Sequence, residues 1–156
     1  MLKATTSNKI KKHVSTKVGE LEYTHKDIFL FKNGIYGFEN LKEFIITTLP
    51  YENTPEVYRC LQSEKEESLT LIMMNVTVNS KGASLIDMKD LEPHLHSKNL
   101  ELKDVAIFLV TSIYKEAGEH RVSVNTAAPI ILEPRSQEGW QVILDSPAYH
   151  VQHFLV

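Results

Sequence analysis

Seven histidines are the side chains in this sequence best suited to hold a metal ion or to exchange a proton near neutral pH. Two pairs have spacings found in metal sites, His94 with His96 and His150 with His153. Residues two apart share a face on a strand and can chelate one ion. Pro93, however, places the first pair in a helix or loop, where such neighbours point in different directions. The second pair would need a helical turn near residue 150. We therefore expect surface histidines, with no metal and no cofactor.

The other reactive side chains do not form a recognisable catalytic motif. Cys60 is the single cysteine, and nothing beside it in the apolar run 57–61 would activate its thiol. One cysteine also excludes an intramolecular disulfide, which fits a reducing compartment. The stretch 33–38 contains two glycines but lacks the Lys-Ser/Thr of a P-loop and the third glycine of a dinucleotide fingerprint. The sequence predicts a protein that is not an enzyme and that acts by binding.

Charge divides the chain into a basic start and an acidic remainder. The whole chain has a net charge of −3, and residues 1–13 contain four lysines and no acidic residue. Without those lysines, 13 basic and 20 acidic residues remain, a balance of −7. A body of this sign repels nucleic acid and favours basic partners, although the same charge also serves simply for solubility. No apolar stretch is long enough to span a membrane, and residues 1–7 lack a signal-peptide segment. We expect a cytoplasmic protein without membrane or direct nucleic-acid contacts.

The scaffold that positions these side chains is predicted to be mainly β. Short runs of alternating or β-branched apolar residues recur along the chain, and turn-forming residues separate them. Such spacing predicts a small antiparallel β-barrel-like domain over 14–156, preceded by a flexible basic arm over 1–13. The expected strands are 14–18 and 20–24, which bend at Gly19, and then 28–31, 44–48, 57–61, 69–78, 105–114, 121–124, 129–132 and 140–144.

One short helix is expected over 87–97. Met88, Leu91 and Leu95 lie there at helical spacing. Pro93 has to occupy the first turn of this helix or break it, because proline lacks the N–H that a later turn requires.

Three segments carry more information when they are read together. The first, 16–44, contains Gly34-Ile35-Tyr36-Gly37-Phe38. The second is Leu61-Gln62-Ser63. The third is Asn125-Thr126-Ala127-Ala128-Pro129-Ile130-Ile131, followed by 139–144 and Tyr149. In order and separation these segments resemble the flagellar assembly factor FliW family, whose first turn reads Gly-Ile-Pro-Gly-Phe, over about residues 16–149. Tyr36 stands where that family usually has proline, and Thr126 stands where leucine is common.

The resemblance implies a non-enzymatic flagellar assembly factor with two alternative protein partners. FliW proteins bind flagellin in the cytoplasm, and after flagellin export they bind the carbon storage regulator CsrA. CsrA is an RNA-binding repressor of flagellin translation, and FliW proteins oppose its RNA binding allosterically. The flagellin termini are disordered until assembly and fold as amphipathic helices on a partner, which calls for an apolar groove. The alternative is a diverged binding module or chaperone for another flagellar or export protein.

The resemblance also suggests contact residues in the exposed motif turns. We expect Gln62 and Asn125 either to contact a partner or only to satisfy turn backbone groups. The full set of expected contacts is Tyr36, Glu39, Gln62, Ser63 and Asn125, with Glu64, Glu66 and Glu67 for electrostatic steering.

Overall fold

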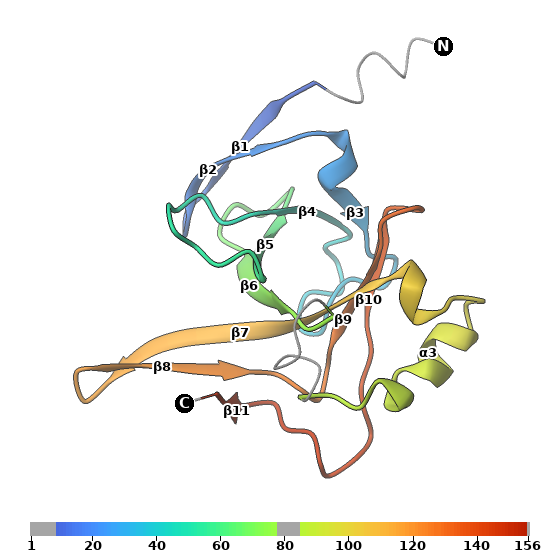
Figure 1. Ribbon diagram of the computed structural model, residues 1–156. Helices are drawn as coiled ribbons and strands as arrows, with labels where there is room; N and C mark the ends of the chain where they lie inside the picture. The colour runs from blue at the N-terminus through green and yellow to red at the C-terminus, as the bar shows by residue number, and fades with distance from the viewer. Residues whose placement is uncertain (1–8, 78–84, 156) are drawn as a thin grey trace, which may run out of the picture.

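The strands that the structure describes build one two-stranded hairpin, residues 11–23, and one nine-stranded sheet (Figure 1). The structure is a computed structural model that describes residues 9–77 and 85–155. Its elements are β1 (Lys11–Ser15), β2 (Gly19–Tyr23), η1 (His25–Asp27), β3 (Ile28–Leu30), β4 (Glu43–Thr47), β5 (Tyr58–Ser63), β6 (Thr70–Asn75), η2 (Met88–Asp90), α3 (Glu92–His96), η3 (Leu102–Asp104), β7 (Ala106–Glu116), β8 (Glu119–Val124), β9 (Ile130–Glu133), β10 (Glu138–Gln141) and β11 (His153–Phe154).

The large sheet closes on itself into a ring. Its strand order is β11-β8-β7-β6-β5-β4-β3-β10-β9, and β9 pairs back onto β7. The strands from β7 through β6, β5, β4, β3, β10 and β9 therefore form a barrel-like circuit. Neighbours in the ring are antiparallel except β3 and β10, which meet in parallel at the single pair Leu30 and Glu138. The prediction of a mainly β, barrel-like domain is confirmed.

Strand β7 is long enough to pair with β9 over its first part and with β8 over its second part. Its first residues, 106–108, pair with β9, and residues 111–116 pair with β8. The second half runs out of the ring together with β8, and β11 pairs with the inner end of β8 (Figure 1). We call this projecting pair of strands, 111–124, the ribbon.

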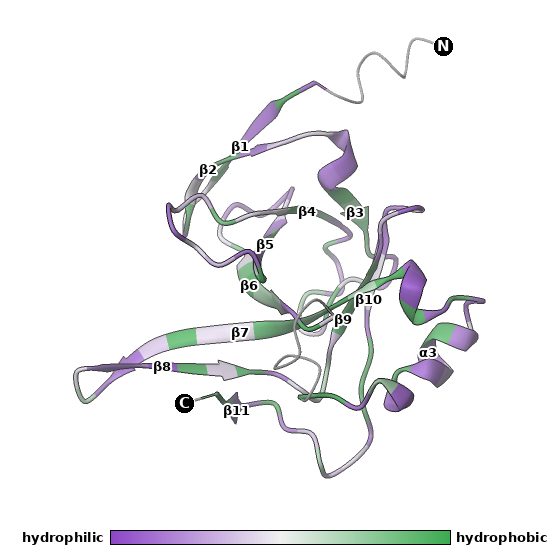
Figure 2. Ribbon diagram, viewed as in Figure 1, coloured by the Kyte–Doolittle hydropathy of each residue, from purple (hydrophilic) through white to green (hydrophobic). Residues whose placement is uncertain are grey.

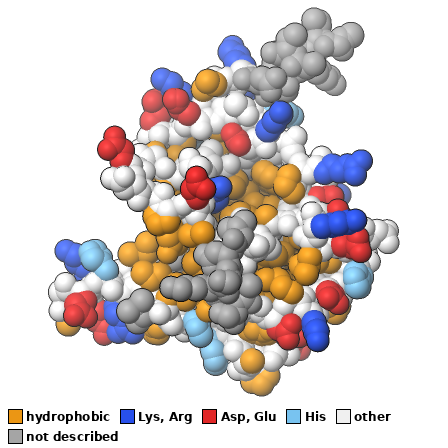
Figure 3. All heavy atoms as spheres, viewed as in Figure 1, with side chains coloured by type: hydrophobic (Ala, Val, Ile, Leu, Met, Phe, Trp, Pro, Cys, Tyr) orange, Lys and Arg blue, Asp and Glu red, His pale blue; other side chains and the backbone are white. Residues whose placement is uncertain are grey.

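Two apolar clusters fill the two sides of the ring wall. Phe108 on β7 belongs to the cluster inside the ring, whereas its neighbours Ile107 and Leu109 belong to a second cluster that includes Leu91 and Leu95 near α3. Successive side chains of a strand point to opposite faces, so β6, β7 and β9 each contribute to both clusters. Figure 2 shows apolar residues along the ring strands and polar residues on β1 and at the ribbon tip. Figure 3 shows apolar side chains gathered where the ribbon meets the ring.

The expected helical segment forms η2 followed by α3. Leu91 and Leu95 are buried, and Pro93 occupies the first turn of α3, where its missing N–H costs no hydrogen bond. The prediction of one short helix is confirmed. Among the helices in 9–77 and 85–155, none has the length and apolar character needed to cross a bilayer.

The two ends of the described chain differ from the prediction. Strand β1 begins at Lys11, so residues 11–13 of the expected arm pair with β2, while residues 1–8 lie outside the described part. Lys12 lies opposite Glu22 and 3.7 Å from the carboxylate of Glu20. The predicted strand 14–18 overlaps β1 only at residues 14 and 15, because polar residues such as Lys12 and Glu22 pair across the first part of the hairpin without apolar alternation. At the other end, β10 stops at Gln141, and the two-residue strand β11 was not expected.

Candidate partner-binding groove

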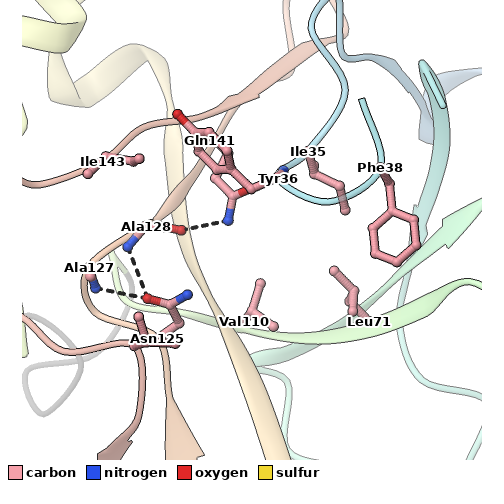
Figure 4. A pocket seen from close by; sticks show the side chains of 11 residues that line it. Ile35, Tyr36, Phe38, Leu71, Val110, Asn125, Ala127, Ala128, Gln141 and Ile143 are labelled. Atoms are coloured by element: carbon pink, nitrogen blue, oxygen red, sulfur yellow. Dashed lines mark hydrogen bonds between the residues drawn. The ribbon is translucent and has the colours of Figure 1, made fainter. Parts of the chain in front are cut away.

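An apolar groove of about 410 Å³ opens where three distant parts of the sequence meet. None of its lining side chains is charged. The segments 34–38, 125–131 and 139–144, which the sequence analysis singled out, all contribute to it (Figure 4). We call it the motif groove. It is lined by Ile35, Tyr36, Phe38, Leu71, Val110, Asn125, Ala127, Ala128, Gln141, Ile143 and Val151.

Gly34 makes the turn that forms one lip of the motif groove. Its φ is +65°, and a Cβ there would lie 2.6 Å from the carbonyl oxygen of Phe38. Only glycine fits this position without displacing the backbone. The turn is closed by a 2.8 Å hydrogen bond from the Phe38 N–H to the Ile35 carbonyl. Ile35 is buried, whereas Tyr36 and Phe38 are exposed at the lip.

Two side-chain amides hold the opposite wall in place. The Oδ1 atom of Asn125 accepts 3.0 Å hydrogen bonds from the N–H groups of Ala127 and Ala128. The Nε2 atom of Gln141 donates to the carbonyl of Ala128 at 3.0 Å, and its Oε1 accepts from the Tyr36 N–H at 2.9 Å. Gln141 therefore joins both walls, and Figure 4 shows the amides beside the small alanines. The groove is preformed and can bury apolar side chains.

Comparison with known proteins decides the family. A family model described as FliW protein matches residues 12–155. The chain belongs to the FliW family. A flagellar assembly factor FliW of Thermotoga neapolitana is 30% identical over 150 residues, covering 90% of this chain and 91% of the relative. One from Clostridium botulinum strain Alaska E43 is 31% identical over 147 residues, covering 92% and 96%.

A solved structure agrees with this assignment. The crystal structure of a flagellar assembly factor FliW matches with a TM-score of 0.68 at 25% identity, over 93% of this chain and 96% of that chain. The FliW match begins inside β1 and thus includes the hairpin, the ring and the ribbon.

The motif groove contains two of the expected contact residues of this FliW-family chain. Tyr36 lies at the lip and is 54% exposed. Asn125 is half-buried in the wall and satisfies turn backbone groups, and its contact with a partner stays a prediction. Glu39 lies just outside, where its carboxylate accepts from the Gly37 N–H at 2.9 Å. The backbone N–H groups of Gly37 and of Glu39 itself hold the pKa of this carboxyl below its ordinary value.

The expectation that Gln62 and Ser63 are exposed is wrong. Both are fully buried at the end of β5. The Nε2 atom of Gln62 lies 2.9 Å from the Ser63 carbonyl, 3.1 Å from the Glu66 carbonyl and 3.3 Å from the Glu67 carbonyl, and its Oε1 accepts from the Thr70 hydroxyl. Gln62 thus satisfies turn backbone groups, which was the second reading of this residue.

Glu64, Glu66 and Glu67 are exposed on the loop between β5 and β6. We call residues 64–67 the acidic loop. The N–H of Thr16 donates to the Glu67 carbonyl at 3.1 Å, and the Nε2 atom of His13 lies 2.9 Å from the Glu64 carbonyl. The loop is therefore fastened to the hairpin, and these three residues do not line the motif groove.

The histidine, cysteine and carboxylate side chains of the described residues do not form a metal site. Within residues 9–77 and 85–155, no three His, Cys, Asp or Glu side chains come close enough to hold a metal ion. His94 and His96 both lie on α3, and His150 is exposed. Cys60 is buried, and the loss of solvation raises the pKa of its thiol to about 12.

The sequence analysis missed several groove residues. Ile143 and Val151 are exposed at the groove, and Leu71 and Val110 line it from β6 and β7. Leu71, Val110 and Ile143 lie in apolar runs, which predict core residues when the chain is taken alone, whereas Val151 lies in no such run. The early end of β10 at Gln141 is what leaves Ile143 at the surface.

Proposed function

We propose that this FliW-family protein is a non-catalytic, cytoplasmic binding protein with two alternative partners. It binds flagellin in the motif groove. When flagellin has been exported, it binds the carbon storage regulator CsrA and relieves the repression of flagellin translation. The observation that carries the proposal is the uncharged, preformed groove built from the three motif segments.

The exposed apolar side chains at the groove support flagellin as its occupant. Tyr36, Ile143 and Val151 are large apolar residues, each more than half exposed, and they converge on one concavity. Exposed apolar residues gathered in this way mark protein-binding surfaces. Covering the exposed half of one isoleucine contributes about 1 kcal/mol. A flagellin terminal segment that folds as an amphipathic helix would supply the complementary apolar face.

The acidic loop supports the second partner. Its backbone carbonyls are hydrogen-bonded to the hairpin and to Gln62, so little backbone freedom of the loop is lost on binding. Its three carboxylates attract a basic, RNA-binding protein and raise the rate of association at low salt. Because the loop and the groove are lined by different residues, the two partners meet different parts of the surface.

A second candidate function is a binding module for another flagellar or export protein. Tyr36 favours it, because an exposed ring at the groove lip replaces the proline that is usual in the FliW family. Under this alternative, purified flagellin and CsrA both fail to bind while another export substrate does.

Titration calorimetry with each purified partner, alone and in competition, tests the proposal. Ile143→Glu places a carboxylate where it would be desolvated, so flagellin affinity should fall by roughly tenfold or more. Ile113→Glu is the matched control, since Ile113 is 51% exposed against 53% for Ile143, does not line the groove and lies on the face of the ribbon opposite to Val110. The proposal fails if neither partner binds the unaltered protein. Equal losses in the two variants would show that the groove is not the flagellin site.

A second pair of variants tests the acidic loop. Glu66→Gln combined with Glu67→Gln should slow CsrA association at low salt and leave flagellin affinity unchanged. The control combines Glu92→Gln with Glu101→Gln, two exposed carboxylates at the α3 side of the molecule. Equal slowing by both pairs would mean that net charge, and not the loop, attracts CsrA.

A further inference from the structure

We infer that the flagellin-binding surface extends from the motif groove onto the ribbon, where a carboxylate of the bound segment pairs with Arg121. This inference rests on the proposed function, because it takes flagellin as the occupant of the groove. The ribbon adds a polar anchor that the uncharged groove cannot provide.

One face of the ribbon continues the floor of the groove. Val110 lines the groove, and residues 112 and 114 follow it on the same face of β7 because side chains alternate along a strand. Ser112 pairs with Ser123, and Tyr114 pairs with Arg121 on β8, so these partners point to the same side. Ser112 is small and exposed, whereas Ser123 is buried. We call the exposed part of this face, beside Ser112, the track.

The C-terminal segment follows the same track. Val151 lines the groove, and three residues later Phe154 pairs with Ser123 on the ribbon face just described. Phe154 meets the ring of Tyr114 edge-on, with centroids 6.2 Å apart. The Arg121 guanidinium lies 4.4 Å from the Phe154 ring centroid. We call Tyr114, Arg121 and Phe154 the ribbon platform.

Arg121 has hydrogen-bonding capacity that the described residues do not use. Among the described residues its one hydrogen-bonding partner is the exposed carboxylate of Glu116, at a long 3.4 Å. Its Nε atom is buried without a partner among the described residues. A guanidinium already oriented by stacking on an aromatic ring is suited to bind a carboxylate through two parallel hydrogen bonds.

The distance along β7 from the motif groove to the ribbon platform defines which side chains the bound segment must have, and at what separation. Val110 and Tyr114 are four residues apart, which is about 13 Å along a strand. A helix rises about 1.5 Å per residue, so about 13 Å corresponds to roughly nine residues. Nine residues make about two and a half turns and would place the side chain on the opposite face, whereas residues seven or eight apart share a face and lie about 11–12 Å apart. The matching segment is therefore an amphipathic helix with apolar residues in the groove and an Asp or Glu about seven or eight residues further along the same face.

Titration of the full-length protein with flagellin monomer tests the inference. Arg121→Gln removes the charge and should weaken flagellin binding about ten- to hundredfold. Arg121→Lys keeps the charge but loses the planar fork, and its effect should be intermediate. Ser112→Tyr places a ring on the exposed track and should also weaken binding. Arg135→Gln removes an exposed arginine elsewhere and should bind as the unaltered protein does.

The outcomes separate the inference from the proposed function. If Ile143→Glu abolishes binding while Arg121→Gln and Ser112→Tyr bind normally, the groove stands and the ribbon extension is overturned. If flagellin does not bind the unaltered protein at all, the proposed flagellin site in the groove and its extension onto the ribbon are both wrong. Thermal melts accompany each variant, and the exposed position of Ser112 keeps the test decisive even if Arg121→Gln does not fold.

Discussion

Replacing Gln62 by alanine should destabilise the protein while leaving the motif groove intact. Gln62 is fully buried, and its amide is surrounded by three loop carbonyls and the Thr70 hydroxyl. Nε2 has two hydrogens, so at most two of the three carbonyls are fully bonded at one time. With the bond accepted from Thr70, the substitution removes three hydrogen bonds, each worth about 1 kcal/mol. The free energy of unfolding should fall by about 3 kcal/mol.

Urea unfolding followed by the fluorescence of Trp140, the single tryptophan, measures this loss. For a chain of 156 residues, about 3 kcal/mol corresponds to a fall of roughly 6–12 °C in Tm. Gln152→Ala is the matched control, because Gln152 is exposed and its amide reaches only the Tyr114 hydroxyl, at 3.2 Å. The control should change stability by less than about 0.5 kcal/mol.

Two results would refute this reasoning. One is a Gln62→Ala protein as stable as Gln152→Ala, which would mean that the buried network contributes nothing. The other is a stable Gln62→Ala protein that no longer binds a partner. That result would return Gln62 to the role of a contact residue, which its burial argues against.

Three further outcomes are expected. Gly34→Ala should lower stability by about 2 kcal/mol more than Gly37→Ala in thermal melts, since both glycines have positive φ but only Gly34 would clash with the backbone; equal losses would contradict this. Gly139→Ala should cost about 1–3 kcal/mol, because its Cβ would lie 2.5 Å from the Phe31 ring, and an unchanged Tm would show that the core adapts. Cys60 should resist iodoacetamide at pH 8 until urea unfolds the chain. Its thiol pKa is raised from 9.0 to about 12 in the folded state, so the free energy of unfolding should fall as pH rises from about 9 towards 12. That slope should be smaller in Cys60→Ala but not absent, because burial also raises the pKa of Tyr23 and of Tyr149 on folding.

The sequence predicted those elements whose apolar pattern is local. Strands β3 to β9 and the segment around α3 follow from alternation or helical spacing, and each contains residues that are buried in one of the two clusters. Strand β1 was predicted only at residues 14 and 15, because residues 11–13 show no apolar alternation and the one fully buried residue of the strand is Ser15. Strand β11 is two residues long and exists through its pairing with β8. Local patterns do not record pairing of that kind.

Local sequence patterns also predicted the candidate site only in part. The sequence identified the segments that build the motif groove, and Tyr36 and Asn125 are in its lining. The sequence did not predict that Gln62 is buried and that Ile143 is exposed. Gln62 lies under the acidic loop with its amide fully engaged, whereas Ile143 follows the end of β10.

The sequence by itself determined the strand-rich class, the short helix, the absence of a recognisable catalytic motif and the resemblance to the FliW family. Only the tertiary structure decided which motif residues meet, and which of them face solvent. The physical reason is that the groove depends on ring closure between β7 and β9 and on turns more than 90 residues apart, such as those joined by Tyr36 and Gln141. Exposure is a property of what packs across a strand, and residues distant in the chain supply that packing.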